Sequence, residues 1–340
     1  MHIEQENDDM FTEAIEKILA DLCTPALVRT VENGHGATTL WRALEDGGFL
    51  ELLTPEDADG AGLTLAALFP IFLAFGRYAL PVPAAQSIAA RALMRDCPQA
   101  LPAGMLTLAG SAHLDAADGL CAPRVAYGLL ADFAVVNLSG ELLLLDCRQA
   151  RREPNGVHGS QCATLYWSAE HVGTSLGNNG EQVRVFNAAI HAAAMAGAME
   201  RALDMTLEYC NDRVQFGKAI GKFQAVQHQL SVMAEQVAAS RIAAERAFAA
   251  EHSVPELIPA AIAKARTSMA VPQVTATAHA LFGAIGVTEE LDLQLFTRRL
   301  HEWRVSEGSE AYWNGIVGRA LLAQPGETAS EFTRHLTPSA

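Results

Sequence analysis

One segment restricts the fold of this chain more than any other. Residues 187–210 are rich in alanine and methionine and run almost without a helix-breaking residue, which predicts a helix of nearly seven turns. Further helices are expected near 222–250, 255–282 and 310–322. Long helices joined by short connections pack antiparallel. We therefore interpret residues 186–340 as a C-terminal helical bundle.

The character of the sequence is different between residues 104 and 185. Short apolar runs alternate there with turn formers, as in MLTLAG, FAVVNLSG, ELLLLDC, TLYWS and QVRVF. Runs of this kind are typical of strands. Leu138-Ser139-Gly140-Glu141 is typical of a hairpin turn between two of them. Residues 104–185 are interpreted as a small β-domain.

The first 103 residues return to helical spacing of apolar side chains. Helices are expected over 8–22, 38–47, 64–76 and 84–95. The predicted fold class is therefore mainly α with a small β-domain. Its three parts, in order, are an N-terminal helical domain over 1–103, a β-domain over 104–185 and a helical bundle over 186–340.

The net charge of the chain excludes some classes of binding partner. The chain of 340 residues has 24 lysines and arginines against 39 aspartates and glutamates, a net charge of −15. Such a field repels nucleic acids and anionic lipid, so neither is expected as a partner, and an anionic ligand needs a local basic site. We find no apolar run of the roughly 20 residues that a membrane span needs. The start, MHIEQENDDMF, is acidic and polar and predicts neither a signal nor a transit peptide. A cytoplasmic protein is expected.

The six cysteines are scattered, without a CxxC pair or a Cys/His cluster of zinc spacing. Dispersed reduced thiols and no metal site are expected.

The first candidate site is RVQFGKAIGKFQAVQHQL, residues 213–230. Arg213 and Lys218 bring positive charge into an acidic chain. Gly217 and Gly221 allow a close approach of the backbone to a ligand, and the helix that follows presents free N–H groups. These features favour a diphosphate site, while a simple helix–helix turn with a solvated arginine remains the alternative.

A second candidate is LFGAIGVTEE, residues 281–290, in which Gly283 and Gly286 allow the same close approach. The alternative is the C-terminal cap of a helix followed by a turn.

The third candidate is HEWRVSEGSEAYWNG, residues 301–315. Glu307 stands beside a glycine and near two tryptophans, where a raised pKa would suit a catalytic base. The alternative is a solvated turn in which Ser306 or Ser309 caps the last helix. Asp204, within an apolar helix, is expected to pair with a cation rather than line a cleft.

At residues 213–224 the sequence closely resembles the RxxFGxxxxxxQ signature of acyl-CoA dehydrogenases. Residues 40–64 resemble the N-terminal helix-and-loop segment of that family, and residues 194–213 resemble the helix before the signature. LFGAIGVTEE resembles the family's GGxGxTxE loop, and SEGS falls where the family carries its catalytic Glu-Gly-Thr. The resemblance covers essentially the whole chain and is weakest in the middle.

This resemblance implies an α-helical domain, a β-domain and a four-helix C-terminal bundle. It implies FAD as the cofactor and an acyl-CoA thioester as the substrate. Glu307 would take the α-proton while a β-hydride passes to the flavin. The implied cofactor contacts, those to the adenosine diphosphate half lying on a neighbouring subunit's FAD, are Arg213, Phe216, Gln224, Gly283, Gly286 and Ser309.

Several positions depart from the family pattern. The Thr-Glu-Pro-type strand is not recognisable, and Ala280, Ala284 and Ala311 replace expected polar or glycine residues. The chain thus resembles a shortened subunit of an α2β2 acyl-CoA dehydrogenase. Two functions stay open: dehydrogenation through Glu307, or completion of a partner's FAD site without chemistry. A helical scaffold or acyl-CoA-binding protein that has lost flavin is a third. The expected partners are a homo- or hetero-oligomer and an electron acceptor such as an electron-transfer flavoprotein.

Overall fold

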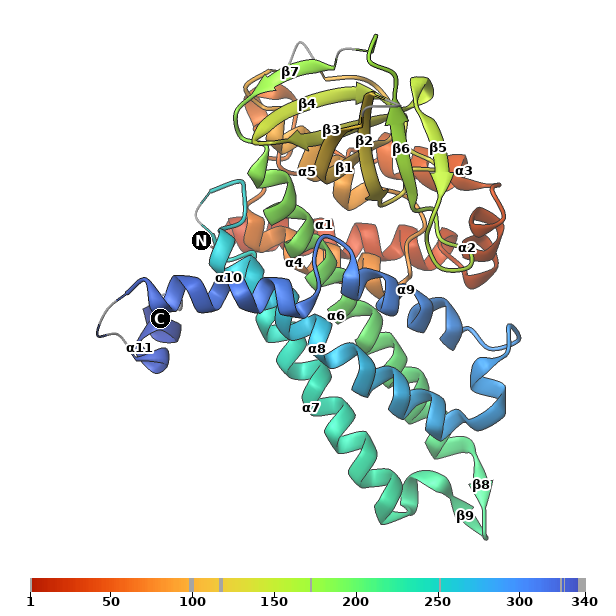
Figure 1. The fold of residues 1–340 in the computed structure, drawn as a ribbon. Coiled ribbons are helices and arrows are strands. Elements are labelled where there is room, and N and C mark those ends of the chain that lie inside the picture. The colour runs from red at the N-terminus through yellow and green to blue at the C-terminus, as the bar shows by residue number, and fades with distance from the viewer. Residues whose placement is uncertain are drawn as a thin grey trace.

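The computed structural model describes residues 2–97, 101–115, 119–171, 173–250, 252–324, 326 and 328–335. Helices come first, a sheet follows, and a second set of helices completes the chain (Figure 1). The sheet lies at one end of the molecule and long helices extend away from it. The predicted fold class, mainly α with a small β-domain, is confirmed.

Five helices precede the sheet: α1 (His2–Leu22), α2 (Pro25–Glu32), α3 (Ala37–Asp46), α4 (Leu65–Arg77) and α5 (Ala84–Leu93). Four of them were expected, whereas α2 was missed. Helix α4 is buried on most sides because it packs directly on α6, a helix of the bundle. A Cβ at Gly76 would stand 2.1 Å from the carbonyl oxygen of Ala194. Glycine at this position therefore brings the two backbones into contact.

The sheet has seven strands in the order β5-β6-β2-β1-β3-β4-β7. Strands β1 and β3 are parallel, and the other neighbours are antiparallel. The predicted hairpin turn joins β3 to β4, with φ of 52° at Ser139 and 95° at Gly140. The strands are β1 (Leu106–Asp115), β2 (Gly119–Val125), β3 (Phe133–Leu138), β4 (Glu141–Asp146), β5 (Arg151–Pro154), β6 (Ala163–Trp167) and β7 (Thr174–Gly177).

The prediction of a strand at QVRVF was wrong. These residues form the first turns of α6 (Glu181–Asp212). Val183 and Phe186 are fully buried, three positions apart, while Val185 between them is less buried. The burial has the period of a helix, although the alternation of letters has the period of a strand.

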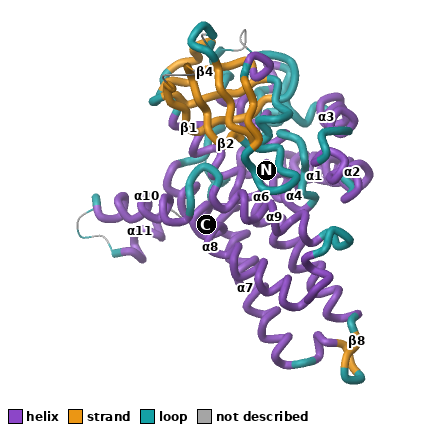
Figure 2. The backbone as a smooth tube through the Cα atoms, turned by 45° about the vertical axis from the view of Figure 1, so that its right-hand side comes forward, coloured by secondary structure: helices purple, strands orange, loops and turns teal. Residues whose placement is uncertain are grey.

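The bundle consists of α6, α7, α8, α9 and α10, and the short α11 follows it. Helices α6, α7 and α8 lie alongside one another in Figures 1 and 2, and α10 packs against α8. A small hairpin of β8 (Val214–Gln215) and β9 (Lys218–Ala219) joins α6 to α7 at the end far from the sheet. The remaining bounds are α7 (Gln224–Arg246), α8 (Leu257–Phe282), α9 (Leu293–Val305), α10 (Glu310–Leu322) and α11 (Ala329–His335).

Helix α8 corrects one expectation. The segment Leu257–Val287 is long and apolar enough, by length and composition, to cross a membrane, although no such run was found in the sequence. Within the fold, 44% of its most apolar window is buried, and α8 packs against α6, α7, α9 and α10. A helix that contacts neighbours on several sides needs an apolar surface all round.

Candidate functional site

The hairpin between α6 and α7 presents an aromatic ring at its tip. Phe216 and Gly217 form its two-residue turn, with φ of 50° and 80°. A bulky residue with positive φ is strained. The side chain of Phe216 is nevertheless 93% exposed, and its ring lies edge-on to that of Phe223, at 6.3 Å between centroids. The backbone here holds a large apolar ring out into solvent.

Arg213 and Gln224 flank this turn. The backbone of Arg213 closes the hairpin, because its carbonyl accepts a hydrogen bond of 2.8 Å from the N–H of Ile220. Its side chain is exposed and makes no hydrogen bond or ion pair with any residue that the structure describes. Gln224 is the first residue of α7 and is exposed too. The guanidinium of Arg213, the ring of Phe216 and the amide of Gln224 are therefore all exposed at the same hairpin.

The second glycine loop lies near the base of this hairpin. Gly283 ends α8 with a φ of 68° and open space around its α-carbon, whereas Gly286 is buried. The ring of Tyr209, in the last turns of α6, stacks on Phe282 at 4.4 Å. Because Tyr209 also accepts the backbone N–H of Arg213, the two loops are held at the same end of the bundle.

Glu307 lies at the other end of α6, between the sheet and the bundle. Its Oε1 accepts hydrogen bonds from the backbone N–H of Gly110 in β1, at 3.2 Å, and from Nδ2 of Asn187 in α6, at 3.1 Å. Burial raises the pKa of Glu307, and the Gly110 bond and the charge of Arg184 act against that rise. A carboxyl with a raised pKa in a partly buried position has the property that a general base needs.

A buried lysine holds the loop that carries Glu307. Lys264 in α8 is 0% exposed, and its Nζ donates to the carbonyl oxygens of Arg304 at 2.9 Å and Gly308 at 3.1 Å. The hydroxyl of Ser268 accepts the third bond at 3.1 Å. Burial lowers the pKa of Lys264 to about 7. The sequence analysis did not identify Lys264. It could have been found as the one lysine of a largely apolar predicted helix, where a buried charge needs partners.

The structure also places two further residues that the sequence analysis singled out, Ser309 and Asp204. Ser309 is the N-cap residue of α10, but its side chain makes no capping bond. Asp204 pairs with Arg77 at 3.0 Å, so its expected pairing with a cation is confirmed.

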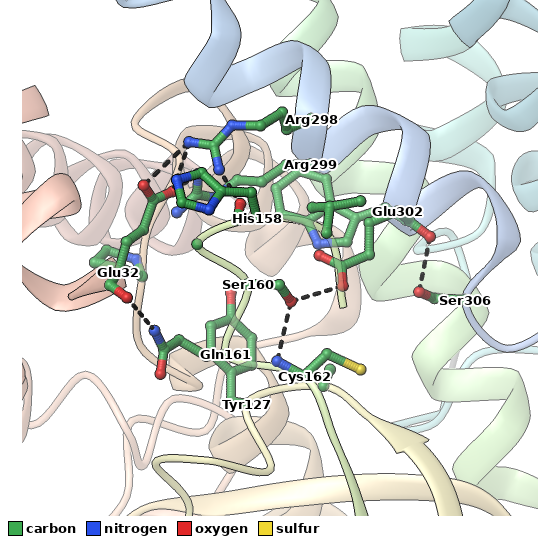
Figure 3. A pocket seen from close by; sticks show the side chains of 15 residues that line it. Glu32, Tyr127, His158, Ser160, Gln161, Cys162, Arg298, Arg299, Glu302 and Ser306 are labelled. Carbon is green, nitrogen blue, oxygen red and sulfur yellow. Dashed lines mark hydrogen bonds and ion pairs between the residues drawn. The ribbon is translucent and has the colours of Figure 1, made fainter. Parts of the chain in front are cut away.

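A small pocket lies between α9, α2 and the loop that precedes β6 (Figure 3). Its polar groups satisfy one another. Arg298 and Arg299 point toward Glu32, with Arg299 2.7 Å from it, and Ser160 donates to Glu302 at 2.6 Å. Burial raises the pKa of Glu302. We call this the outer pocket; sequence reasoning did not find it.

Tyr127 and Trp303 line the outer pocket and also a second, smaller space. We call the second space the inner chamber. Its walls come mainly from α4, α5 and α6, which were all expected from the sequence as separate helices.

Comparison with known proteins decides the family. The profile described as "Acyl-CoA dehydrogenase, N-terminal domain" matches residues 5–101, and the one described as "Acyl-CoA dehydrogenase, C-terminal domain" matches residues 185–322. This chain belongs to the acyl-CoA dehydrogenase family. It is an oxidoreductase of the class that acts on CH–CH bonds. The sheet, in which the Thr-Glu-Pro-type strand is not recognisable, lies in the interval that the two matches leave uncovered, whereas Ala280, Ala284 and Ala311 lie within the C-terminal match.

Individual relatives agree with this assignment. The chain is 29% identical over 301 residues to acyl-CoA dehydrogenase IpdE2 of Mycolicibacterium smegmatis, covering 87% of this chain and 93% of IpdE2. It is 30% identical over 302 residues to FadE34 of Mycobacterium tuberculosis, covering 81% of this chain and 42% of FadE34. The fold matches a chain of the Mycobacterium tuberculosis ChsE4-ChsE5 complex with a TM-score of 0.82 and 21% identity, covering 94% and 98%.

FAD is the cofactor of the acyl-CoA dehydrogenase family, and the two ends of α6 fit it differently. An exposed arginine, an exposed ring and open glycines at the hairpin suit a diphosphate and its nucleoside. At the other end, Glu307 touches both β1 and α6. A Cβ at Gly110 would stand 2.1 Å from Oε2 of Glu307 and 3.2 Å from the α-carbon of Arg184. A thioester stacked between a carboxylate and a flavin ring separates the two by about 7 Å, because each van der Waals contact takes about 3.5 Å. Glu307 is in direct contact with β1, so the ring does not fit between them in this arrangement.

Proposed function

We propose that this chain is a subunit of an acyl-CoA dehydrogenase assembly in which its hairpin completes the FAD site of a neighbouring subunit. The observation that carries the proposal is the separation of the two ends of α6. Asn187, beside Glu307, and Arg213, at the hairpin, are 26 positions apart along one helix, which is about 39 Å. One FAD does not span that length within one chain.

The hairpin has the composition of an unfinished binding site. Phe216 is strained and exposed, and Arg213 has no acidic partner among the described residues. Strain and exposed apolar surface are retained where a partner or ligand offsets them. A FAD held mainly by a neighbouring subunit, with its diphosphate reaching this hairpin, satisfies both residues at once.

Two relatives support a neighbour of the same family rather than a second identical copy. The ChsE4-ChsE5 complex contains two different polypeptides and includes a chain of this fold. FadE34 is more than twice as long as the segment that matches this chain, so one relative carries the counterpart of this chain together with further sequence. By analogy, a full-length subunit encoded elsewhere supplies the flavin-ring contacts.

A second candidate is dehydrogenation by this chain with Glu307 as the base. It is favoured by the raised pKa of Glu307 and by the lysine that holds its loop. For this role the carboxylate must leave Gly110, and the loop must move away from the sheet. Ser309, which replaces the threonine of the family motif, would then lie beside the same cofactor.

The stoichiometry of flavin tests the proposal. The chain is purified alone and together with a candidate partner subunit, and FAD is quantified in each species after size-exclusion chromatography. We expect little FAD on the chain alone and one FAD per pair of different chains in the assembly. A homomer with one FAD per chain that turns over an acyl-CoA without a second polypeptide would refute the proposal.

The two candidates separate in the variant Glu307→Gln of this chain. If the neighbour performs the chemistry, turnover of the assembly is nearly unchanged. If Glu307 is the base, turnover falls by roughly 10²–10⁴-fold with flavin still bound. Reoxidation by an acceptor such as an electron-transfer flavoprotein, and a cytoplasmic location, stay predictions.

A further inference from the structure

A cavity of about 270 Å³ lies where the N-terminal helices meet the bundle. Its walls come from the turn between α1 and α2, the end of α4, the middle of α6 and the start of α9. We call it the junction cavity. A cavity of about 150 Å³ is enough to hold a benzene molecule. The junction cavity therefore has room for a ring that carries a further functional group.

Three charged side chains line the junction cavity, and one of them has no partner. Arg77 is paired with two carboxylates of α6, each at 3.0 Å, and Asp292 is paired with Arg29 at 2.8 Å. Arg201 of α6 is exposed at the cavity and makes no hydrogen bond or ion pair with any described residue. The uncompensated charge of the cavity is therefore positive, in a chain whose net charge is −15.

A hydroxyl group adds a second free donor to the same cavity. Oγ1 of Thr24, the N-cap of α2, accepts the backbone N–H of Leu27 at 3.3 Å. The hydroxyl proton itself has no acceptor among the described residues, and a hydroxyl can donate and accept at once. The neighbouring thiol of Cys23 stays uncharged at neutral pH, because burial raises its pKa to about 12. The free polar groups of the cavity thus suit a ligand that accepts hydrogen bonds and carries negative charge.

The rest of the lining restricts that ligand further. Most of it is apolar and includes Ala20, Pro25, Val28, Leu295 and Phe296. Small-molecule sites combine such walls with a few polar groups. The carboxylates of Glu200 and Asp204, which hold Arg77, lie on α6 one position before Arg201 and three positions after it. A ligand with two or more negative charges would meet their repulsion.

We propose that the junction cavity binds a small carboxylate with a compact apolar body, such as a ring. The planar guanidinium of Arg201 matches the two oxygens of one carboxylate, the hydroxyl of Thr24 donates to the same group, and the body lies against the apolar walls. A neutral ligand of the same shape leaves the arginine unpaired, and a cation is repelled by it.

This inference goes beyond the proposed function, because the junction cavity is separate from both ends of α6. Arg201 lies 14 positions after Asn187 and 12 before Arg213 along one helix, which is about 21 Å and 18 Å. No residue of the hairpin and no residue that contacts Glu307 lines the cavity. Binding of the carboxylate therefore needs neither flavin nor a second subunit.

Four small probes test the inference in the full chain: cyclohexanecarboxylate, cyclohexanecarboxamide, cyclohexylmethylammonium and acetate. Binding is measured by ligand-observed NMR, and crystals soaked with cyclohexanecarboxylate locate it. Cyclohexanecarboxylate should bind most tightly. The carboxamide, which lacks the charge, and acetate, which lacks the apolar body, should each bind at least tenfold more weakly. The ammonium ion should not bind in the cavity.

Substitutions of Arg201 separate the charge from the walls. In Arg201→Gln, cyclohexanecarboxylate should bind at least tenfold more weakly, while the weak binding of the carboxamide stays unchanged. Arg201→Lys keeps the charge without the fork and should bind the carboxylate more tightly than Arg201→Gln does. Arg42→Gln is the matched control. Arg42 is an exposed arginine of α3 that has no partner among the described residues and does not line the cavity, so this variant should bind all four probes as the wild type does.

Three results overturn the inference. The first is equal binding of the carboxylate and the carboxamide, or of the carboxylate to the wild type and to Arg201→Gln. The second is a crystal structure with the carboxylate bound elsewhere on the chain. The third is an assembly in which a side chain of the partner subunit fills the cavity and excludes the carboxylate, because the cavity would then be part of a subunit interface. The FAD role of the hairpin is measured by flavin content, so its failure is recognised separately.

Discussion

The two ends of α6 differ in how far the chain satisfies its own groups. At the hairpin, Arg213 has no partner within the described part of the protein, and Phe216 is strained and almost fully exposed. At the sheet, the carboxylate of Glu307 accepts two hydrogen bonds, and Lys264 has three acceptors. The first end presents groups without partners to solvent, whereas at the second the two charged groups are held by contacts within the chain, although the buried Oδ1 of the neighbouring Asn187 has no partner among the described residues.

This difference separates a surface that serves binding from one that serves stability. A strained backbone lowers the stability of an isolated chain, so its presence at the hairpin points to an external partner that offsets the cost. Hydrogen bonds between buried polar groups contribute to the stability of the fold, and a ligand that needs these groups must first displace their present partners. Substitutions at the hairpin should therefore affect cofactor binding, and those near Glu307 should affect unfolding.

The largest effect is expected for Arg213→Ala. Loss of the guanidinium should weaken FAD binding by the assembly by about 2–5 kcal/mol, the cost of removing one partner of a charged contact. FAD retained after dilution is measured by its visible absorbance. Arg201→Ala, an exposed arginine on the same helix, is the control and should retain FAD. If the Arg213→Ala variant retained all of its FAD, Arg213 would not bind the diphosphate.

Lys264→Met should be the most destabilising change at the end of α6 near the sheet. Methionine has a similar length but no donors, so the carbonyls of Arg304 and Gly308 lose their shared partner. The free energy of unfolding should fall by about 2–4 kcal/mol, measured with urea. Lys218→Met, in the exposed hairpin, should change it by less than about 0.5 kcal/mol. If the two variants lost the same free energy of unfolding, the proposed difference between the two ends of α6 would be wrong.

The next effect depends on pH and concerns His191. Its pKa is about 4 in the fold and about 6.5 in an unfolded chain. Between these values the unfolded chain binds a proton that the folded chain does not. Stability therefore falls as pH decreases from 6.5 to 4, by roughly 3 kcal/mol. Urea unfolding at several pH values should show this slope, and His191→Gln should reduce it. His228→Gln, exposed on α7, should keep it.

The smallest effect is expected for Phe216→Gly, and its sign is the informative part. Glycine adopts positive φ without strain, so the isolated chain should become more stable by about 1 kcal/mol. The assembly should meanwhile hold FAD less tightly, because the exposed ring is lost. The two quantities are measured by urea unfolding and by FAD retention. A loss of stability would show that the ring supports the fold itself.

Local features of this protein were readable from its sequence. The predicted helix at 310–322 is α10, Glu310–Leu322, and Ser139-Gly140 forms the predicted turn. The signature from Arg213 to Gln224 spans a dozen positions, so its residues had to lie in one loop. Helical periodicity, turn chemistry and short motifs depend on neighbours along the chain. For that reason the sequence alone was sufficient to place them.

Only the tertiary structure decided which distant residues meet. Glu307 accepts hydrogen bonds from Gly110 and Asn187, 197 and 120 positions away, and Lys264 reaches two carbonyls around the same loop. No spacing in the sequence encodes these contacts, because they depend on how α6 and α8 pack under the sheet. The same packing places the signature and the candidate base at opposite ends of one helix. The sequence by itself determined the resemblance to the family and the basic, glycine-containing loop at 213–224; the packing decided that the two sites are separate.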